Sequence, residues 1–198
     1  MLNGGVLQLH HPDGQVFRFD PGSLAFAFSV TGAPINSEWF ETLHEPMDLE
    51  RWAADVLGAI SIRATASSVS EGKRLRAAIW NAAEAVIDGR AVRASDRSTL
   101  NAFAAQPSLV PRLDPDGKRS WVPSAKVSAL FSTIARDIIE VATGELASRI
   151  RRCEGVNCAI PFLDTSRPGT RRWCSMERCG NRAKVAAHRR RHRQEVST

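Results

Sequence analysis

All four cysteines of the 198-residue chain lie within one short stretch, in the pattern C-x4-C-x15-C-x4-C. They are Cys153, Cys158, Cys174 and Cys179. Thiolates are soft ligands that bind Zn²⁺ tetrahedrally, and two close pairs joined by a loop can surround one ion with four sulfurs. Such a site leaves no open position for water or substrate. The spacing therefore predicts one structural Zn²⁺, with two disulfides or free thiols as the alternatives.

A second ligand set uses two histidines that follow the cysteines. His188 and His192 are four residues apart, so they would lie on one face of a helix. Together with Cys174 and Cys179 they could form a Cys₂His₂ site. Only eight residues separate Cys179 from His188, whereas a Cys₂His₂ finger has about twelve there. The other two cysteines would also have no partner, so the four-cysteine set is the better hypothesis.

The segment that contains the cysteines is also the most basic part of the chain. Residues 151–198 hold 12 of the 27 Lys and Arg residues but only 4 of the 21 acidic ones, which gives them a charge of +8 and the rest −2. An asymmetry of this size favours a polyanionic partner, although a solvated tail would share the composition. A helix after the last cysteine would present its arginines together. The predicted nucleic-acid-binding residues are Arg171, Arg172, Arg178, Arg182, Lys184, Arg189, Arg190 and Arg193.

Apolar periodicity predicts the elements that position these groups. Two or three short strands are predicted before residue 32, followed by helices from Asp48, over 70–88 and after Ser95, a hairpin at 114–117 and a helix over 124–147. The predicted fold class is α+β. A mostly helical N-terminal domain with a small N-terminal sheet takes residues 1–147, and a small treble-clef-like zinc finger takes residues 148–198.

Enzyme and membrane functions find little support in these patterns. Gly72-Lys73 lacks the earlier glycine of a phosphate-binding loop, because Ser67 stands in its place. Arg76 and Asn101 are the candidates for a polar ligand pocket in the first domain. No secretory leader and no apolar run long enough to span a bilayer are present, so a cytoplasmic protein is predicted. Because no catalytic motif is found, the protein is also predicted not to be an enzyme.

The stretch "FLDTSRPGTRRWCSMERCGNRAKVAAHRRRHR" resembles the CGNR zinc finger, which is named after the run Cys179-Gly180-Asn181-Arg182. Proteins with this finger usually carry an N-terminal ABATE domain, described as a stress-induced transcription regulator. Residues 1–147 are similar to it in "RLRAA" and "LAFAFSVT". The stretch "LAFAFSVT" departs from the pattern of the family, because Ala27 and Val30 stand where the family has Asp and Asn.

This resemblance implies a bacterial transcription regulator with a DNA-binding finger and an N-terminal sensing or interaction domain. DNA is then the expected partner. A small-molecule effector of the N-terminal domain is a further expectation. A homodimer is another, because one small finger buries little surface on DNA. Treble-clef fingers also bind RNA or proteins, and these remain the alternatives.

Overall fold

The computed structural model describes residues 4–32 and 40–196. The α-helices within these residues are α1 (Leu24–Ser29), α3 (Pro46–Leu57), α4 (Ala66–Ile87), α5 (Ala94–Ala104), α6 (Val127–Thr143) and α7 (Asn181–Val196). The strands are β1 (Leu7–His10), β2 (Val16–Phe19), β3 (Ser61–Ile62), β4 (Pro111–Leu113), β5 (Arg119–Trp121), β6 (Ser124–Ala125), β7 (Ile150–Arg152) and β8 (Pro161–Leu163). A 3₁₀ turn, η1 (Ala147–Arg149), and a π-helical turn, η2 (Met176–Gly180), complete the list. The α+β class is confirmed.

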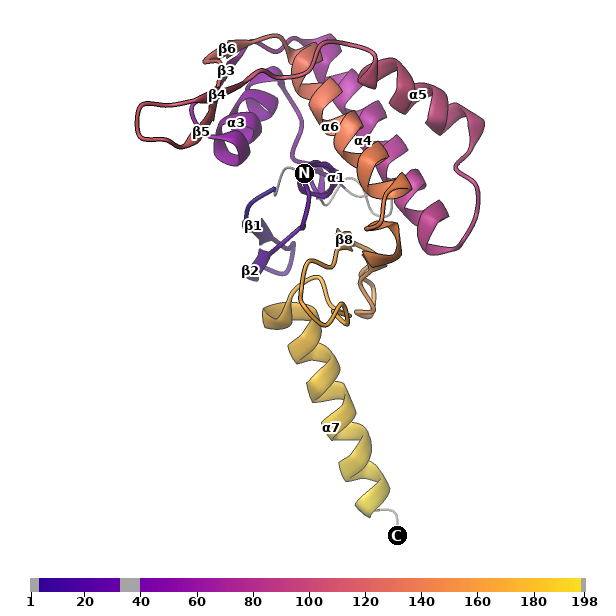
Figure 1. Ribbon diagram of the computed structural model, residues 1–198. Coiled ribbons are helices and arrows are strands. Elements are labelled where there is room, and N and C mark those ends of the chain that lie inside the picture. Colours follow the sequence, from indigo (N-terminus) through magenta and orange to yellow (C-terminus); the bar gives the residue numbers. More distant parts are fainter. Residues whose placement is uncertain (1–3, 33–39, 197–198) are drawn as a thin grey trace.

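Helices α4, α5 and α6 pack side by side, and α4 and α6 cover the short helix α1 (Figure 1). Every residue of α1 is buried. The Ser23 hydroxyl accepts a hydrogen bond from the Phe26 N–H at 3.3 Å, and Asp137 accepts one from the Ala25 N–H at 2.9 Å. These side chains satisfy the free N–H groups at the start of the helix.

The sequence allowed a third strand where α1 lies, and that reading was wrong. A short apolar run that is buried on every side has no polar face, so its periodicity cannot separate a strand from a helix. The two strands before it do form. β1 and β2 make an antiparallel hairpin that pairs Leu7 with Phe19 and His10 with Val16.

The other predicted helices form with shifted ends. α3 begins at Pro46 instead of Asp48, and the Asp48 carboxylate accepts hydrogen bonds from the N–H groups of His44 and Glu45 at 2.8 and 3.0 Å. α4 begins after Thr65 and stops before Gly89, which has φ +63°. α6 ends at Thr143, before the predicted residue 147. The predicted hairpin forms as β4 and β5.

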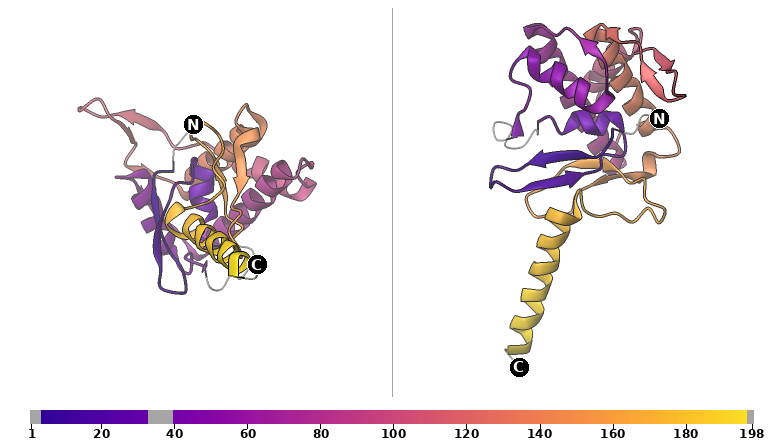
Figure 2. Two further views of the ribbon diagram at one scale, coloured as in Figure 1. Left: turned by 90° about the horizontal axis from the view of Figure 1, so that it is seen from below. Right: turned by 90° about the vertical axis from the view of Figure 1, so that its left-hand side faces the viewer.

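The strands pair in four two-stranded sheets among the described residues, and only β3 with β6 is parallel. The apolar core has two parts. The larger joins the helices and includes Ile150 and Leu163 from β7 and β8. The smaller contains Phe17, Phe19 and Phe162 together with cysteines, and it lies below the helices (Figures 1 and 2). No helix in the described part of the chain is long and apolar enough to cross a membrane.

Candidate metal centre and basic helix

The first cysteine pair lies in the turn between β7 and β8. These strands are antiparallel and pair Arg152 with Pro161, so Cys153 leaves one strand as Cys158 approaches the other. The Cys158 N–H donates to the Gly155 carbonyl at 3.0 Å, which closes the turn. A Cβ on Gly155 would lie 2.7 Å from Cys179 Sγ. Only glycine therefore lets the turn approach the other cysteine pair this closely.

The second pair is positioned by η2. Cys174 lies just before this turn and Cys179 within it, and the Gly180 N–H donates to the Ser175 carbonyl at 3.0 Å, a π-type bond. α7 then follows directly. The turn residues Pro168-Gly169, between the two pairs, have apolar residues on both sides, which predicts a hairpin there. That prediction is wrong, because β8 pairs with the earlier strand β7 and no strand follows residue 163 in the described chain.

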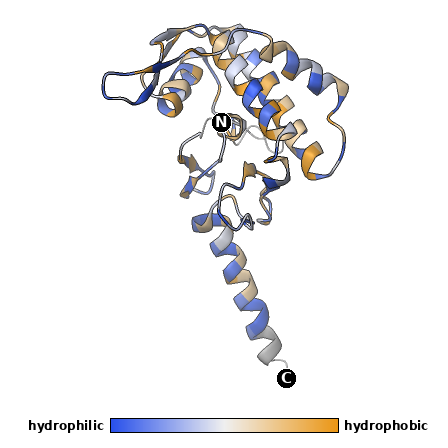
Figure 3. Ribbon diagram, viewed as in Figure 1, coloured by the Kyte–Doolittle hydropathy of each residue, from blue (hydrophilic) through white to orange (hydrophobic). Residues whose placement is uncertain are grey.

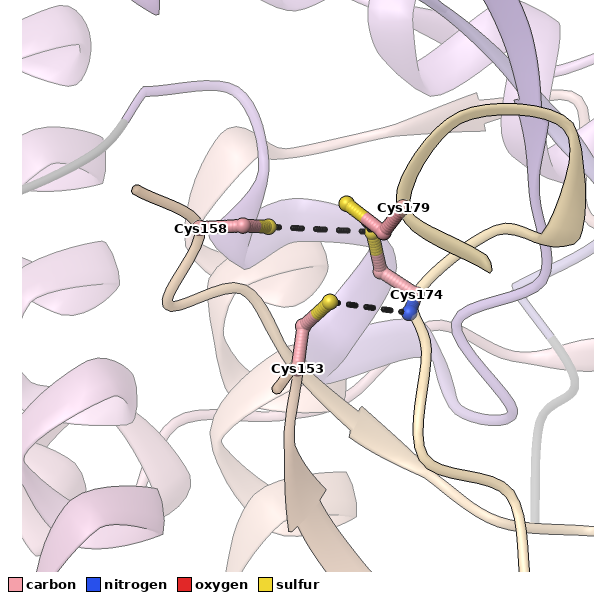
Figure 4. A group of neighbouring side chains, drawn as sticks. All are labelled: Cys153, Cys158, Cys174 and Cys179. Atoms are coloured by element: carbon pink, nitrogen blue, oxygen red, sulfur yellow. Dashed lines mark hydrogen bonds between the residues drawn. The ribbon is translucent and has the colours of Figure 1, made fainter. Parts of the chain in front are cut away.

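The four side chains point toward a common centre (Figure 4). All four sulfurs lie within 4.8 Å of one another, with 3.7 Å between Cys158 and Cys174 and 3.6 Å between Cys174 and Cys179. A tetrahedral Zn²⁺ with Zn–S bonds of about 2.3 Å requires sulfurs about 3.8 Å apart. The residues therefore fit one zinc ion. No disulfide joins them.

Hydrogen bonds and charge repulsion govern the ionisation of the cluster. A hydrogen bond from the Cys158 thiol, helped by the N–H of Cys174 at 3.2 Å, lowers the pKa of the Cys153 thiol. The same cluster raises the pKa of Cys174, chiefly through its hydrogen bonding with Cys153 and with burial adding to the effect. Four adjacent thiolates repel one another, so full ionisation requires a cation at the centre.

The protein binds one structural zinc through these cysteines. His188 and His192 lie on the exposed part of α7 and do not belong to the sulfur cluster, so the Cys₂His₂ alternative was wrong. The reason is local. Cys179 lies within η2, and its sulfur belongs to the cluster with those of the β7–β8 turn. The two histidines follow more than two turns further along α7, which leads away from that turn (Figure 1).

Two of the predicted nucleic-acid-binding arginines point into the protein. Arg178 is only 4% exposed and donates to Asp13 and Gln15. Arg171 stacks on the Phe162 ring at 4.2 Å and donates to backbone carbonyls, including that of Asp20 at 2.8 Å. The prediction that these two arginines are presented at the surface with the others was wrong, because their guanidinium groups bond to internal acceptors, part of which the N-terminal segment supplies.

The remaining basic residues are at the surface. Arg172 is exposed, pairs with Glu154 through an Nε–Oε2 contact of 2.7 Å and lies over the Trp173 ring. α7 itself presents four further predicted side chains, which are exposed: Arg182, Lys184, Arg189 and Arg190. The side chain of Arg193, the last of the set, lies outside the described part of the chain.

α7 extends away from the rest of the molecule (Figures 1 and 2). Within the described residues, it packs mainly against η2, the turn that precedes it. Ala183 and Ala187 are only half-buried, and Val185 is 49% exposed. Hydrophilic residues recur along its length (Figure 3). A helix that is polar on all sides gains little from packing within its own chain, so it is available to a partner.

In the described part of the chain, Arg76 and Asn101 do not line a common pocket. Arg76 is 8% exposed and its guanidinium forms a two-point ion pair with Glu41, whereas Asn101 is exposed on α5. A shallow groove exists elsewhere and is lined by residues from 106–110 and 122–129. Neither predicted residue lines it. Because Arg76 is buried, its guanidinium pairs with the Glu41 carboxylate and does not face a ligand.

Two family models match the chain. Residues 22–145 match the ABATE domain, described as "Putative stress-induced transcription regulator", and residues 149–192 match the CGNR zinc finger. The chain belongs to the ABATE family. Its zinc centre is that of a CGNR finger, and both descriptions concern regulatory or metal-binding modules instead of enzymes. A comparison with curated proteins found no match.

Sequence reasoning missed three residues of this ABATE protein that support the finger: Asp13, Gln15 and Gly155. The glycine carried a signal, because it stands between two metal ligands where a tight turn is needed. Asp13 carried only a turn signal, in Pro12-Asp13-Gly14. Its partner Arg178 lies 165 residues away in the sequence.

Proposed function

We propose that this protein is a transcription regulator whose helix α7 binds duplex DNA. The observation that carries the proposal is a basic helix that leaves the zinc finger, extends away from the helical body (Figure 1) and has exposed basic side chains along its length. As a straight helix, its 16 residues would extend about 24 Å and measure about 10–12 Å across with side chains. The major groove of B-DNA, about 12 Å wide, accepts such a helix.

The distribution of charge around α7 favours a groove over a flat surface. At about 100° per residue, Arg182 and Arg189 lie on one side, and Lys184 and Arg191 lie nearly opposite. Phosphates border a groove on both sides, so both sets can contact the backbone while the helix lies between them. The major groove of A-form RNA is too deep and narrow for side chains to read, which favours DNA.

The helical body then supplies regulation, as a sensing or interaction domain. A small-molecule effector could act through this body. Dimerisation suits a regulator with one small finger, because two copies double the contacted half-sites. A regulator of this kind would act in the cytoplasm. RNA or an acidic protein surface is the second candidate partner, favoured by the same exposed arginines.

The test is fluorescence anisotropy of the zinc-loaded full chain with duplex DNA and with structured RNA over a salt series. About five phosphate contacts would give a slope of log affinity against log salt near −4 to −5. The double variant R189A/R190A should reduce the magnitude of this slope by about 2. Arg63 and Arg112 are exposed on the body, so R63A/R112A removes the same charge and should leave the slope unchanged.

The possible results of this experiment distinguish the candidate partners. Binding to duplex DNA that depends on Arg189 and Arg190 supports the proposal. Equal or tighter binding to RNA would favour RNA as the partner in place of DNA. An absence of binding to either nucleic acid would contradict both of these partners and leave the acidic protein surface. A slope that falls equally in R63A/R112A would show that net charge, and not α7, holds the nucleic acid.

A further inference from the structure

The N-terminal hairpin lies outside both family matches, which begin at residues 22 and 149. Its apolar face nevertheless packs into the cysteine cluster. Phe17 and Phe19 are buried there beside Phe162, with Leu7 and Leu9 at the margin. None of these residues belongs to the larger helical core. The hairpin therefore buries its apolar surface against the finger.

The tip of the hairpin binds the finger through a buried charge. The two Asp13 carboxylate oxygens accept hydrogen bonds from Arg178 at 3.2 and 2.9 Å, and Gln15 Oε1 accepts a third at 2.6 Å. The guanidinium also lies over the Phe17 ring at 5.6 Å. A buried guanidinium needs such acceptors, because an unpaired charge in the interior is strongly unfavourable. Arg178 immediately precedes the ligand Cys179, so the hairpin holds the turn that carries the metal ligand.

Further contacts between the N-terminal segment and the finger lie on both sides of the Asp13–Arg178 pair. Glu177 Oε2 accepts from the Arg18 N–H at 2.8 Å, and Asp13 also lies 3.5 Å from Arg182 in the first turn of α7. At the other end, the Leu163 N–H donates to the Pro21 carbonyl at 3.0 Å. Arg171 joins Asp20 to the finger in the same region. The hairpin thus touches β8, η2 and α7, while its chain continues directly into the buried helix α1.

We propose that the β1–β2 hairpin and the CGNR finger form one zinc-dependent folding unit, in which Asp13 is the positioning residue for η2 and the start of α7. The sequence alone placed a single boundary near residue 148. In the composite unit, β1 and β2 fold together with β7, β8 and η2 around the metal. The direction in which α7 leaves the body is then determined by the hairpin, whatever partner α7 binds.

Hydrogen exchange of the full chain, zinc-loaded and after treatment with a chelator, tests the folding unit. Removal of zinc should abolish protection of the amides in β1 and β2 together with those of β7, β8 and η2. The amides of α4 and α6 should stay protected, because the helical core has its own apolar packing. Protection that survives in the hairpin, or loss that extends equally to α4 and α6, would overturn the proposal.

A pair of matched variants tests Asp13. Asp13 accepts from the Gln15 N–H at its own hairpin turn, and Asp114 accepts from the Lys118 N–H at the turn of β4–β5. The second hairpin lies at the opposite end of the molecule from the finger (Figure 1). D13N should speed the release of zinc to a chromogenic chelator by about three- to tenfold, as expected for weakening a hydrogen bond to a charged group. D114N should leave the release rate unchanged.

A double-mutant cycle separates positioning from general destabilisation. R178Q should also speed zinc release, and D13N/R178Q should release zinc no faster than the more severe single variant, because both changes break one interaction. Unfolding of α4 and α6, followed by hydrogen exchange, should be the same in all three variants. Additive effects on zinc release, or equal effects of D13N and D114N, would contradict the assignment.

Discussion

Replacement of Glu41 by glutamine removes the counter-ion of a buried arginine in the helical body. Arg76 Nη1 and Nη2 lie 2.8 and 2.7 Å from the two Glu41 oxygens, and Nη1 donates to Thr31 Oγ1 at 3.3 Å. Lys73 lies 3.4 Å from the same carboxylate. E41Q keeps the shape of the side chain but leaves two cations without their anion. The helical body should therefore lose stability.

The pKa of Glu41 gives the magnitude. Burial alone would raise this pKa, but the hydrogen bonds from Arg76 and the Leu43 N–H, with the charge of Lys73, lower it from 4.5 to about 2. At about 1.4 kcal/mol per pKa unit, the carboxylate contributes about 3 kcal/mol to the free energy of unfolding near neutral pH. Breaking one partner of a buried pair costs about 3–5 kcal/mol in other proteins. We expect E41Q to lower the free energy of unfolding by about 2–3 kcal/mol, because the Gln amide still accepts one hydrogen bond.

The stabilisation by Glu41 should depend on pH in the direction that its lowered pKa requires. The pKa of Glu41 is lower in the folded chain than in the unfolded chain, so its stabilisation is complete above about pH 4.5 and is lost as the pH falls toward 2. Glutamine does not titrate in this range. The difference in stability between the wild type and E41Q should therefore shrink as the pH falls.

Urea unfolding followed by tryptophan fluorescence measures this difference, because Trp52 and Trp80 both lie in the helical body. Comparison of the two chains at each pH cancels any effect of zinc loss in acid. Glu71 is exposed on α4, the helix that carries Arg76, so E71Q is the matched control and should change stability by less than about 0.5 kcal/mol. A gap that is the same at neutral pH and near pH 3, or an E41Q effect no larger than that of E71Q, would refute the reasoning.

Three further variants test the finger and the core. C174S should abolish stoichiometric zinc binding, measured by metal analysis. In hydrogen exchange, the amides of the finger and of β1–β2 should lose protection while those of α4 keep it. Unchanged zinc content would contradict the four-cysteine site. G155A should speed zinc release, because its Cβ would lie 2.7 Å from Cys179 Sγ, and an unchanged rate would show that the turn can move without loss. W80F should lower the free energy of unfolding by about 1–3 kcal/mol in urea titrations, because it removes the Nε1 donor, 2.9 Å from the buried Ser29 carbonyl; a smaller change would mean that another donor reaches this carbonyl.

The sequence by itself determined the features that depend on neighbouring residues. Cysteine spacing predicted the zinc ligands, because metal geometry limits how ligands can be spaced along a short chain. Apolar residues three and four apart predicted α3, α4, α5 and α6, since a helix that packs on one side repeats with that period. The concentration of arginine after Cys179 predicted a basic helix, and the turn residues at 114–117 predicted the β4–β5 hairpin.

Only the tertiary structure decided which of these groups meet. The residues around α1 bury all its sides, which removes the alternation of polar and apolar residues that would identify it as a helix. Arg178 points inward because Asp13, 165 residues away in the sequence, supplies a carboxylate. Arg76 likewise takes Glu41 as its partner in place of a ligand. Charges and apolar faces choose partners by distance in space, and a linear pattern records only the distance along the chain.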